Sequence, residues 1–153
     1  MSTAGAPGGN HVPRGITARA RDLVVVKHRT YVDSRGALVP IELVKVVPYA
    51  VARLFWIGDV PSGQQRGAHA HYSCSQYMIC MAGVVRIDAT DGIEQRTFDL
   101  AVGEALLVPP LIWATEQYIG DGAMLLVLCD KPYDADDYIH SFEKFRAAVA
   151  NRA

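Results

Sequence analysis

The chain has 153 residues, 50% of them apolar and 20% charged, with a formal net charge of −1. This length fits one compact domain, and the composition excludes a disordered chain or a strongly basic nucleic-acid binder. Three cysteines are too few for a disulfide framework or a structural zinc site, which indicates a reducing compartment. No apolar run approaches the roughly 20 residues that span a bilayer, and the first residues lack the apolar centre of a secretory signal. We therefore expect a cytoplasmic protein with no membrane segment.

The first 20 residues differ in composition from the rest of the chain. They consist mainly of Gly, Pro, Ala, Ser and Thr with scattered Arg, and they offer little apolar surface to bury. Such a segment is typical of a flexible terminus. We predict a flexible leader over residues 1–20, followed by a single domain over residues 21–153.

From Leu23 onward, short runs rich in β-branched and aromatic residues are separated by turn signals at intervals of about 8–12 residues. About ten such runs follow one another with no long helix among them, which predicts an all-β sandwich or barrel. Between two of the runs, the pair Asp91-Gly92 predicts a tight hairpin, because Gly tolerates the positive φ of a type I′ turn.

Only the C-terminal segment has a helical pattern. Asp134 can cap a helix whose first turn holds two further aspartates, where negative charge meets the positive end of the helix dipole. We therefore predict a helix over residues 135–150, with an apolar stripe that packs on the core. The apolar residues at helical spacing are Ile139, Phe142, Phe145 and Val149.

Two of the five histidines stand together in the segment RGAHAH, residues 66–71. Residues i and i+2 of a strand point to the same face, so His69 and His71 are expected to project side by side. Imidazole titrates near pH ~6.5 and can both take and return a proton at neutral pH. The pair therefore indicates acid–base chemistry.

The histidine pair belongs to a longer frame, in which Gln76, Gly83 and Gly103 follow and Pro109-Pro110 precedes an aromatic run. This frame resembles the two sequence motifs of the cupins, small β-barrels of jelly-roll type. In metal-binding cupins a Glu and a later His complete the ligand set, but here those positions hold Gln76 and Ala114. Two imidazoles and an amide make a poor divalent-metal site, so we expect neither a metal nor another cofactor.

Longer segments narrow the resemblance. They are residues 33–38 (DSRGAL), 41–42 (IE), 53–57 (RLFWI), 66–71 (RGAHAH), 108–110 (VPP) with Trp113, and 133–139 (YDADDYI). In this order and spacing the chain resembles the sugar 3,4-ketoisomerases, cupin enzymes that act on dTDP-4-oxo-6-deoxyglucose. The resemblance implies a cupin jelly-roll barrel of about ten short strands with one C-terminal helix, assembled as a homodimer.

The resemblance also implies a reaction that moves a ketone from C4 to C3 of the sugar through an enediol. This shift needs one base and a nearby proton carrier, and no metal or redox cofactor. We place His69 as the base at C3. His71 then carries a proton between the oxygens or to C4.

Four residues are candidates for binding the nucleotide sugar. Arg53 and Arg66 offer the forked donors that suit anionic groups. Gln76 can aim an amide at the sugar hydroxyls, and Trp113 can stack on the base. Each also has a structural alternative, namely ion pairing, buried hydrogen bonding or core packing.

The chain departs from the family pattern at two positions next to these candidate residues. Ala114 stands where many members have His, and Tyr72 stands where many have Lys. Thr115, Glu116 and Tyr118 are candidates to take over the role of the missing histidine.

Other functions stay open at this point. A dTDP-4-oxo-sugar 3,5-epimerase shares the first, enolising step, although the RGAHAH segment favours the ketoisomerase. A non-catalytic cupin that binds a small ligand would fit Ala114. A metal-dependent oxygenase fits least, because the metal-ligand set is incomplete.

Overall fold

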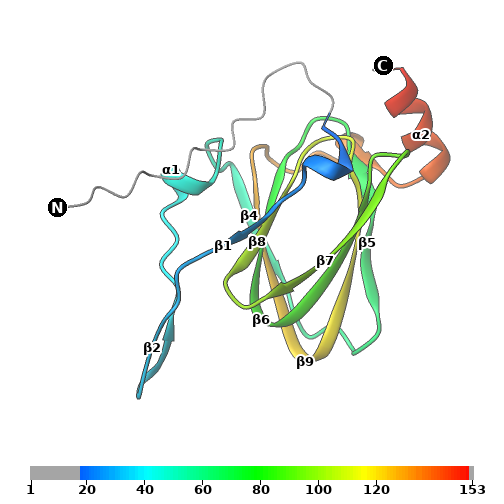
Figure 1. The fold of residues 1–153 in the computed structure, drawn as a ribbon. Helices are drawn as coiled ribbons and strands as arrows, with labels where there is room; N and C mark the ends of the chain where they lie inside the picture. The colour runs from blue at the N-terminus through cyan, green and yellow to red at the C-terminus, as the bar shows by residue number, and fades with distance from the viewer. Residues whose placement is uncertain (1–17, 152–153) are drawn as a thin grey trace.

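Two long strands, β6 (Gln76–Thr90) and β9 (Trp113–Cys129), pair with each other in antiparallel fashion and form the framework of the barrel (Figure 1). Each strand bends in the middle and contributes one half to each of two layers. The computed structural model describes residues 18–151. Among these residues, no helix has the length and apolar character needed to cross a membrane.

Within residues 18–151, the structure has eight further, shorter strands and four helical segments. The strands are β1 (Val25–Lys27), β2 (Tyr31–Asp33), β3 (Gly36–Leu38), β4 (Arg53–Ile57), β5 (Gln65–His71), β7 (Gln95–Ala101), β8 (Glu104–Val108) and β10 (Tyr138–Ile139). The helical segments are the 3₁₀ turns η1 (Ala20–Asp22) and η2 (Ala135–Asp137) and the helices α1 (Leu43–Val46) and α2 (Phe142–Ala150). The expected all-β fold with about ten strands and a C-terminal helix is therefore confirmed.

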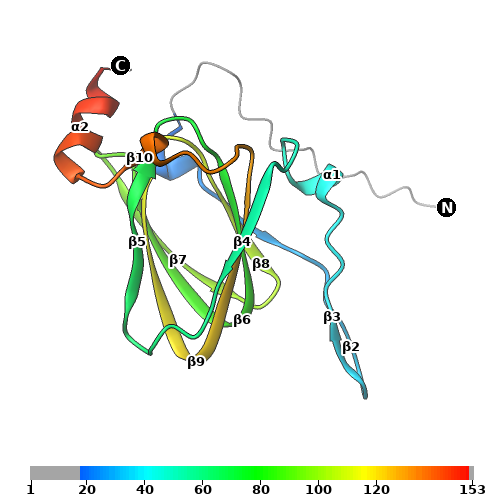
Figure 2. The same ribbon diagram turned by 180° about the vertical axis from the view of Figure 1, so that it is seen from behind.

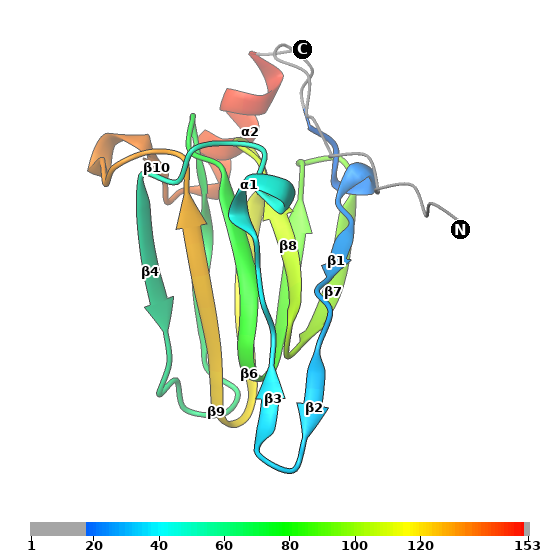
Figure 3. The same cartoon turned by 90° about the vertical axis from the view of Figure 1, so that its left-hand side faces the viewer.

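The bend in the long strands creates the two layers. One layer has the order β1-β8-β6-β9-β4 (Figure 3). The other has the order β7-β6-β9-β5-β10. The pairing register shifts on both sides of Ala82, where β6 turns the corner. Gly83 has a φ of 65°, and a Cβ there would lie 2.9 Å from Ala123, so glycine is required at this corner. From the sequence we expect residues 75–81 and 83–90 to form two separate short strands. In the structure they are the two halves of one bent strand, β6.

The main core lies between the layers, and each layer is also covered on its outer face. Residues 41–51, which include α1, cover the outer face of the β6-β8-β9 layer. Helix α2 covers the outer face of β5 and β9, where Phe145 packs against Ala70 and Leu111 (Figure 2). The apolar residues of the chain are therefore divided between the main core inside the barrel and two smaller clusters on its outer faces.

The C-terminal helix begins at Phe142, not at residue 135. Asp134 caps only the short turn η2, whereas the hydroxyl of Ser141 caps α2 by accepting from the N–H of Lys144. Between these two segments, β10 pairs with β5 in antiparallel fashion. Its extended backbone cannot belong to a helix, so this strand pairing overrides the helical spacing of the apolar residues.

The predicted hairpin at Asp91-Gly92 is present, but its turn is longer than type I′. Pairing of β6 with β7 ends at Thr90 and Gln95, which leaves a four-residue loop. The buried Asp91 carboxylate accepts hydrogen bonds from two N–H groups of this loop and from the N–H of Ala20. Most of the predicted leader, residues 1–17, lies outside the described residues, but its last residue, Ala20, is fully buried against this loop.

Candidate active site

The two histidines of β5 lie side by side on the inner face of the barrel, as their spacing predicts. Their ring centroids are 5.1 Å apart and the rings are nearly perpendicular, at 82°. Ala70 between them points outward under α2. Just before the pair, Gly67 and Ala68 have φ values of 73° and 55°, and the register with β9 shifts there. This bulge re-aims the strand at the point where His69 enters the barrel.

Asp137 of η2 orients His71. The Nδ1 of His71 lies 3.0 Å from an Asp137 carboxylate oxygen, which also accepts from the N–H of Cys74, while the other oxygen accepts from the N–H and hydroxyl of Ser73. Burial opposes ionisation of Asp137, but the hydrogen bonds from Ser73, His71 and Cys74 outweigh it and hold its pKa below the usual value. A charged Asp137 accepts only, so Nδ1 of His71 carries the hydrogen and Nε2 keeps its lone pair.

Both imidazoles are neutral bases in this setting. Burial, which disfavours the charged form, lowers the pKa of His69 and of His71 below 6.5. For His71 the neighbouring Asp137 offsets part of this effect. The ring of Tyr138 packs against both, with its centroid 4.3 Å from that of His71 and 5.1 Å from that of His69. Two unprotonated nitrogens are thus available at neutral pH.

A cavity of about 290 Å³ opens beside His69. Two of the predicted binding residues, Arg66 and Gln76, line it together with His69, and Gln76 is buried at the floor of the barrel. The remaining lining residues are Phe55, Trp56, Ile57, Gly67, Met78, Glu116, Val127 and Tyr138.

Arg53 lies behind this cavity and touches it through Tyr138. Its Nη2 is 3.4 Å from the Tyr138 hydroxyl and 3.5 Å from Sγ of Cys129, and its guanidinium carbon lies 5.4 Å from the ring centre of Tyr133. Its Nε is buried without a hydrogen-bond partner. The structure therefore places this predicted binding residue next to the site rather than on its surface.

Trp113 is not brought to the cavity. Its ring packs against Phe142 and Phe145 of α2, at centroid distances of 5.2 and 5.7 Å. The reason is strand alternation: Ala114, the next residue of β9, pairs with His69 and faces the interior, so Trp113 faces outward. Trp113 is therefore a packing residue under α2. It does not line the cavity, so it is not positioned to stack on a nucleotide base bound there.

Glu116 is the one residue with a carboxyl group among the described residues that line the cavity. The sequence indicated it only as one of three candidates for the role of the histidine missing at position 114. Burial raises its pKa to about 7, and the positive charge of Arg66 opposes that rise. One of its oxygens, Oε2, is buried without a hydrogen-bond partner. A Cβ on Gly67 would lie 2.9 Å from both carboxylate oxygens, so the glycine lets β5 approach this carboxyl. Its closeness to Ala114, where many members of the resembled family have His, was the signal for it in the sequence.

In the part of the chain that the structure describes, one group of side chains has ligand atoms close enough together to hold a metal ion. The ligand atoms of His71, Cys74 and Asp137 all lie within 4.8 Å of one another. However, His71 and Asp137 are hydrogen bonded to each other. Asp137 also accepts three further hydrogen bonds, from Ser73 and Cys74. These hydrogen bonds explain why the three side chains lie close together: Asp137 orients His71.

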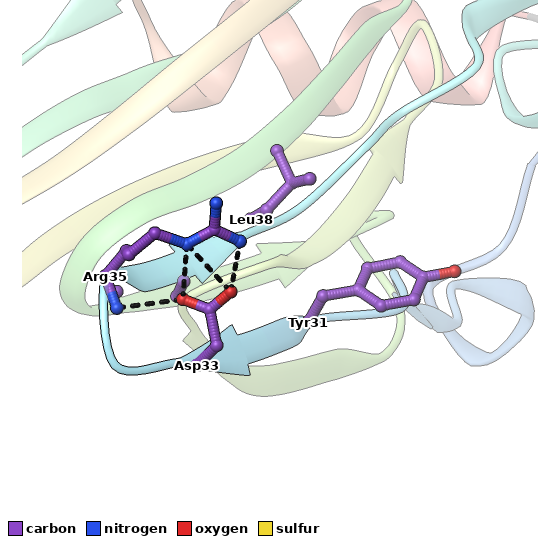
Figure 4. Close-up of a pocket in the computed structure, with 6 residues that line it drawn as sticks. Tyr31, Asp33, Arg35 and Leu38 are labelled. Carbon is purple, nitrogen blue, oxygen red and sulfur yellow. Dashed lines mark hydrogen bonds and ion pairs between the residues drawn. The ribbon is translucent and has the colours of Figure 1, made fainter.

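A second hollow, of about 620 Å³, lies along the β2–β3 hairpin. Its charged groups are already paired, because the guanidinium and N–H of Arg35 donate to the Asp33 carboxylate (Figure 4). The hairpin forms a separate two-stranded sheet that projects away from the barrel (Figures 1 and 2). Among the described residues that line this hollow there is no histidine.

Proteins similar to this chain in sequence and in fold include sugar 3,4-ketoisomerases. The chain is 34% identical over 129 residues to the TDP-4-oxo-6-deoxy-α-D-glucose 3,4-oxoisomerase of Aneurinibacillus thermoaerophilus, covering 82% of this chain and 91% of that protein. The crystal structure of QdtA, a sugar 3,4-ketoisomerase from Thermoanaerobacterium thermosaccharolyticum in complex with TDP, superposes with a TM-score of 0.78 at 28% identity. The match covers 86% of this chain and 96% of that one.

A more distant structure shows the same fold alone. The dTDP-4-dehydrorhamnose 3,5-epimerase of Bacillus anthracis superposes with a TM-score of 0.70 at 17% identity, over 82% of this chain and 81% of that chain. Residues 21–150, in contrast, match the FdtA family (WxcM-like, C-terminal). This match and the 34%-identical relative together show that the chain belongs to the FdtA family.

Proposed function

We propose that this protein is a 3,4-ketoisomerase that moves the keto group of dTDP-4-oxo-6-deoxyglucose from C4 to C3. The observation that carries the proposal is the pair of neutral imidazoles on β5, one of them oriented by Asp137, beside a cavity with both polar and apolar lining residues. The 3,4-oxoisomerase at 34% identity supports the choice of reaction and substrate. An epimerase is supported only by a shared fold.

His69 lines the cavity and acts as the base that removes the proton from C3. Removal is possible because the adjacent carbonyl acidifies this proton and because the imidazole is neutral. The resulting enediol needs a proton at C4. His71 accepts the proton from His69 on Nε2 and returns it to C4, while Asp137 stabilises the transient imidazolium through Nδ1. No metal or redox cofactor takes part in this sequence of steps.

Binding of the nucleotide sugar is divided between the floor and the rim of the cavity. A volume of about 290 Å³ is at the small end of the range for ligand pockets, so it suits the sugar ring, with the nucleotide extending outward. Gln76 at the floor is placed for the sugar hydroxyls. Arg66, which is exposed at the rim, is placed for the diphosphate.

The test is an incubation with dTDP-4-oxo-6-deoxyglucose in deuterated water, in a metal-free buffer, followed by NMR of the sugar. A 3-oxo product is the expected result, and it carries deuterium at C4 to the extent that the protonated histidines exchange the carried proton with the solvent. A carbonyl that stays at C4 with an inverted neighbouring centre would indicate the 3,5-epimerase. Tight binding without any deuterium uptake would indicate the non-catalytic cupin.

His69→Asn should lower turnover by ~10²–10⁴-fold, because the variant keeps the size of the side chain but has no titrating nitrogen. His28→Asn is the matched control. His28 bonds the Tyr77 hydroxyl, whose ring belongs to the apolar cluster on the outer face of the other layer. Normal turnover in His69→Asn would remove His69 from the mechanism.

The proposed assembly is a homodimer in the cytoplasm, with the β2–β3 hairpin at the interface. Isolated two-stranded hairpins are marginally stable in water, and Val32 and Leu38 of this hairpin are 75% and 64% exposed. A second copy would cover them. Light scattering after size exclusion should give the mass of two chains, and Val32→Asp should shift the protein toward the mass of one.

A further inference from the structure

We propose that Glu116 is a further catalytic residue, the carboxyl group that carries a proton between the two oxygens of the enediol. The inference rests on the proposed ketoisomerase function and adds a group for a task that the two histidines leave open. Isomerisation moves one proton between carbon atoms, and it also moves one proton between oxygen atoms. The second transfer needs its own donor and acceptor within the same cavity.

The position of Glu116 meets this requirement. It lines the same cavity as His69, but from the neighbouring strand β9. Ala114, which pairs with His69, ends in a methyl group and leaves the space in front of the imidazole open. Because alternate residues share a face, Glu116 is the next inward side chain along β9. The carboxyl and the base therefore face one substrate from two adjacent walls.

Strand β5 is shaped to accommodate this carboxyl. Gly67 has a φ of 73°, in the left-handed region that favours glycine. Any Cβ at this position would collide with both carboxylate oxygens at 2.9 Å and with the Ala114 carbonyl at 3.0 Å. The same residue thus provides the bulge before His69 and the room for Glu116.

The hydrogen-bonding capacity of the barrel interior points to a polar ligand. Among the described residues, five buried side-chain atoms have no hydrogen-bond partner. Four of them belong to the inner face of the barrel, namely Arg53 Nε, His71 Nε2, Glu116 Oε2 and Tyr118 Oη. Buried polar atoms are nearly always hydrogen bonded, so four exceptions on the inner face of one barrel, with Glu116 itself in the cavity lining, fit a site that binds a polyhydroxy substrate.

The surroundings keep Glu116 able both to give and to take a proton. Arg66 faces it from β5, Tyr118 follows it on β9, and His69 shares its cavity; its partner on β6 is the apolar Ile87. Burial holds the pKa of Glu116 at about 7 against the opposing charge of Arg66. A group with this pKa transfers protons in both directions near neutral pH.

The proton transfers balance. As His69 removes the proton from C3, the Glu116 carboxyl donates its proton to the C4 carbonyl oxygen, and the C3–C4 double bond of the enediol forms. The Glu116 carboxylate then accepts the proton of the C3 hydroxyl as C4 receives its proton by way of His71. The C3 carbonyl forms, and Glu116 is again protonated. The two oxygens are on adjacent carbons, so a single carboxyl serves both.

The experiment compares Glu116→Gln with wild type and with Glu94→Gln. Glu94 is the matched control because it also has a buried oxygen without a partner, but in the loop between β6 and β7. Glutamine keeps the shape of the carboxyl and cannot transfer the proton. Glu116→Gln should lower kcat by ~10²–10⁴-fold, whereas Glu94→Gln should keep wild-type kcat. Glu116→Asp should restore part of the lost activity.

The pH profile separates proton transfer from a structural role. Only protonated Glu116 starts the cycle, so wild-type kcat/KM should fall as the pH rises above about 7. Glu116→Gln should lose this alkaline limb and keep the acid limb of His69. A slow variant that keeps the alkaline limb, or one with wild-type kcat, overturns the role of Glu116 and leaves the ketoisomerase intact. An inactive wild type would instead refute the proposed function.

Discussion

The protonation state of Glu116 has a consequence for folding that can be measured without any substrate. The ordinary pKa of a glutamate is 4.5, and burial raises that of Glu116 to about 7 in the folded protein. A raised pKa means that the folded state binds the proton more tightly than the unfolded state does. The associated stability is complete below pH 4.5 and is lost as the pH rises through about 7.

The size of this effect follows from the shift. One pKa unit corresponds to about 1.36 kcal/mol. Between about pH 5 and the folded-state pKa of about 7, the pH rises by roughly two units. The free energy of unfolding of wild type should therefore fall by about 2–3 kcal/mol through this group between about pH 5 and pH 8. Glu116→Gln removes the titration and keeps the size of the side chain. The variant should therefore gain about 2–3 kcal/mol relative to wild type between these two pH values.

The assay is urea denaturation of both proteins at about pH 5 and pH 8, followed by tryptophan fluorescence at one protein concentration. The difference between the proteins at each pH cancels the other titrating groups, His69 and His71 among them. A difference in unfolding free energy that stays the same within about 1 kcal/mol at both pH values would falsify the burial of a protonated carboxyl. The proton-transfer role of Glu116 would lose its chemical basis at the same time.

Three further variants test other parts of the site and its support. Asp137→Asn should lower turnover by about 10²-fold or more, because an amide can donate to Nδ1 and place the hydrogen of His71 on Nε2. Steady-state kinetics measures this loss, and an unchanged kcat would refute the orienting role of Asp137. Gly67→Ala should lower both turnover and the unfolding free energy, the latter by about 1 kcal/mol or more, because of its positive φ and its contact with Glu116. A melting temperature equal to that of wild type would contradict that contact. Phe145→Ala should cost about 3–5 kcal/mol, since this side chain is fully buried between α2 and the outer face of β5; a loss below about 1 kcal/mol in urea denaturation would show that α2 packs loosely.

Much of the fold and half of the site follow from local patterns in the chain. The alternation of apolar residues with turn signals specifies strands, because a period of two places every second side chain in the core. The same period puts His69 and His71 on one face, and the structure agrees. The order of the RGAHAH, VPP and YDADDYI segments indicates the family, which the match over residues 21–150 confirms.

The remainder depends on which strands become neighbours, and that is a property of the whole barrel. Asp137 lies 66 residues from His71 and meets it only because β10 pairs with β5. This pairing also converts the start of the predicted helix into a strand. Local periodicity carries no information about such long-range pairing.

The sequence by itself determined the strand-rich architecture and the pair of bases, since each rests on residues close together in the chain, and it determined the family through the order of short segments along the chain. Only the tertiary structure decided the inward or outward direction of each residue of β9, because that depends on its pairing with β5 and β6. This parity sends Trp113 outward onto α2 and Glu116 inward onto Gly67. A tryptophan expected in the site thereby becomes part of the packing under α2, and a glutamate that belongs to no motif faces the cavity beside His69.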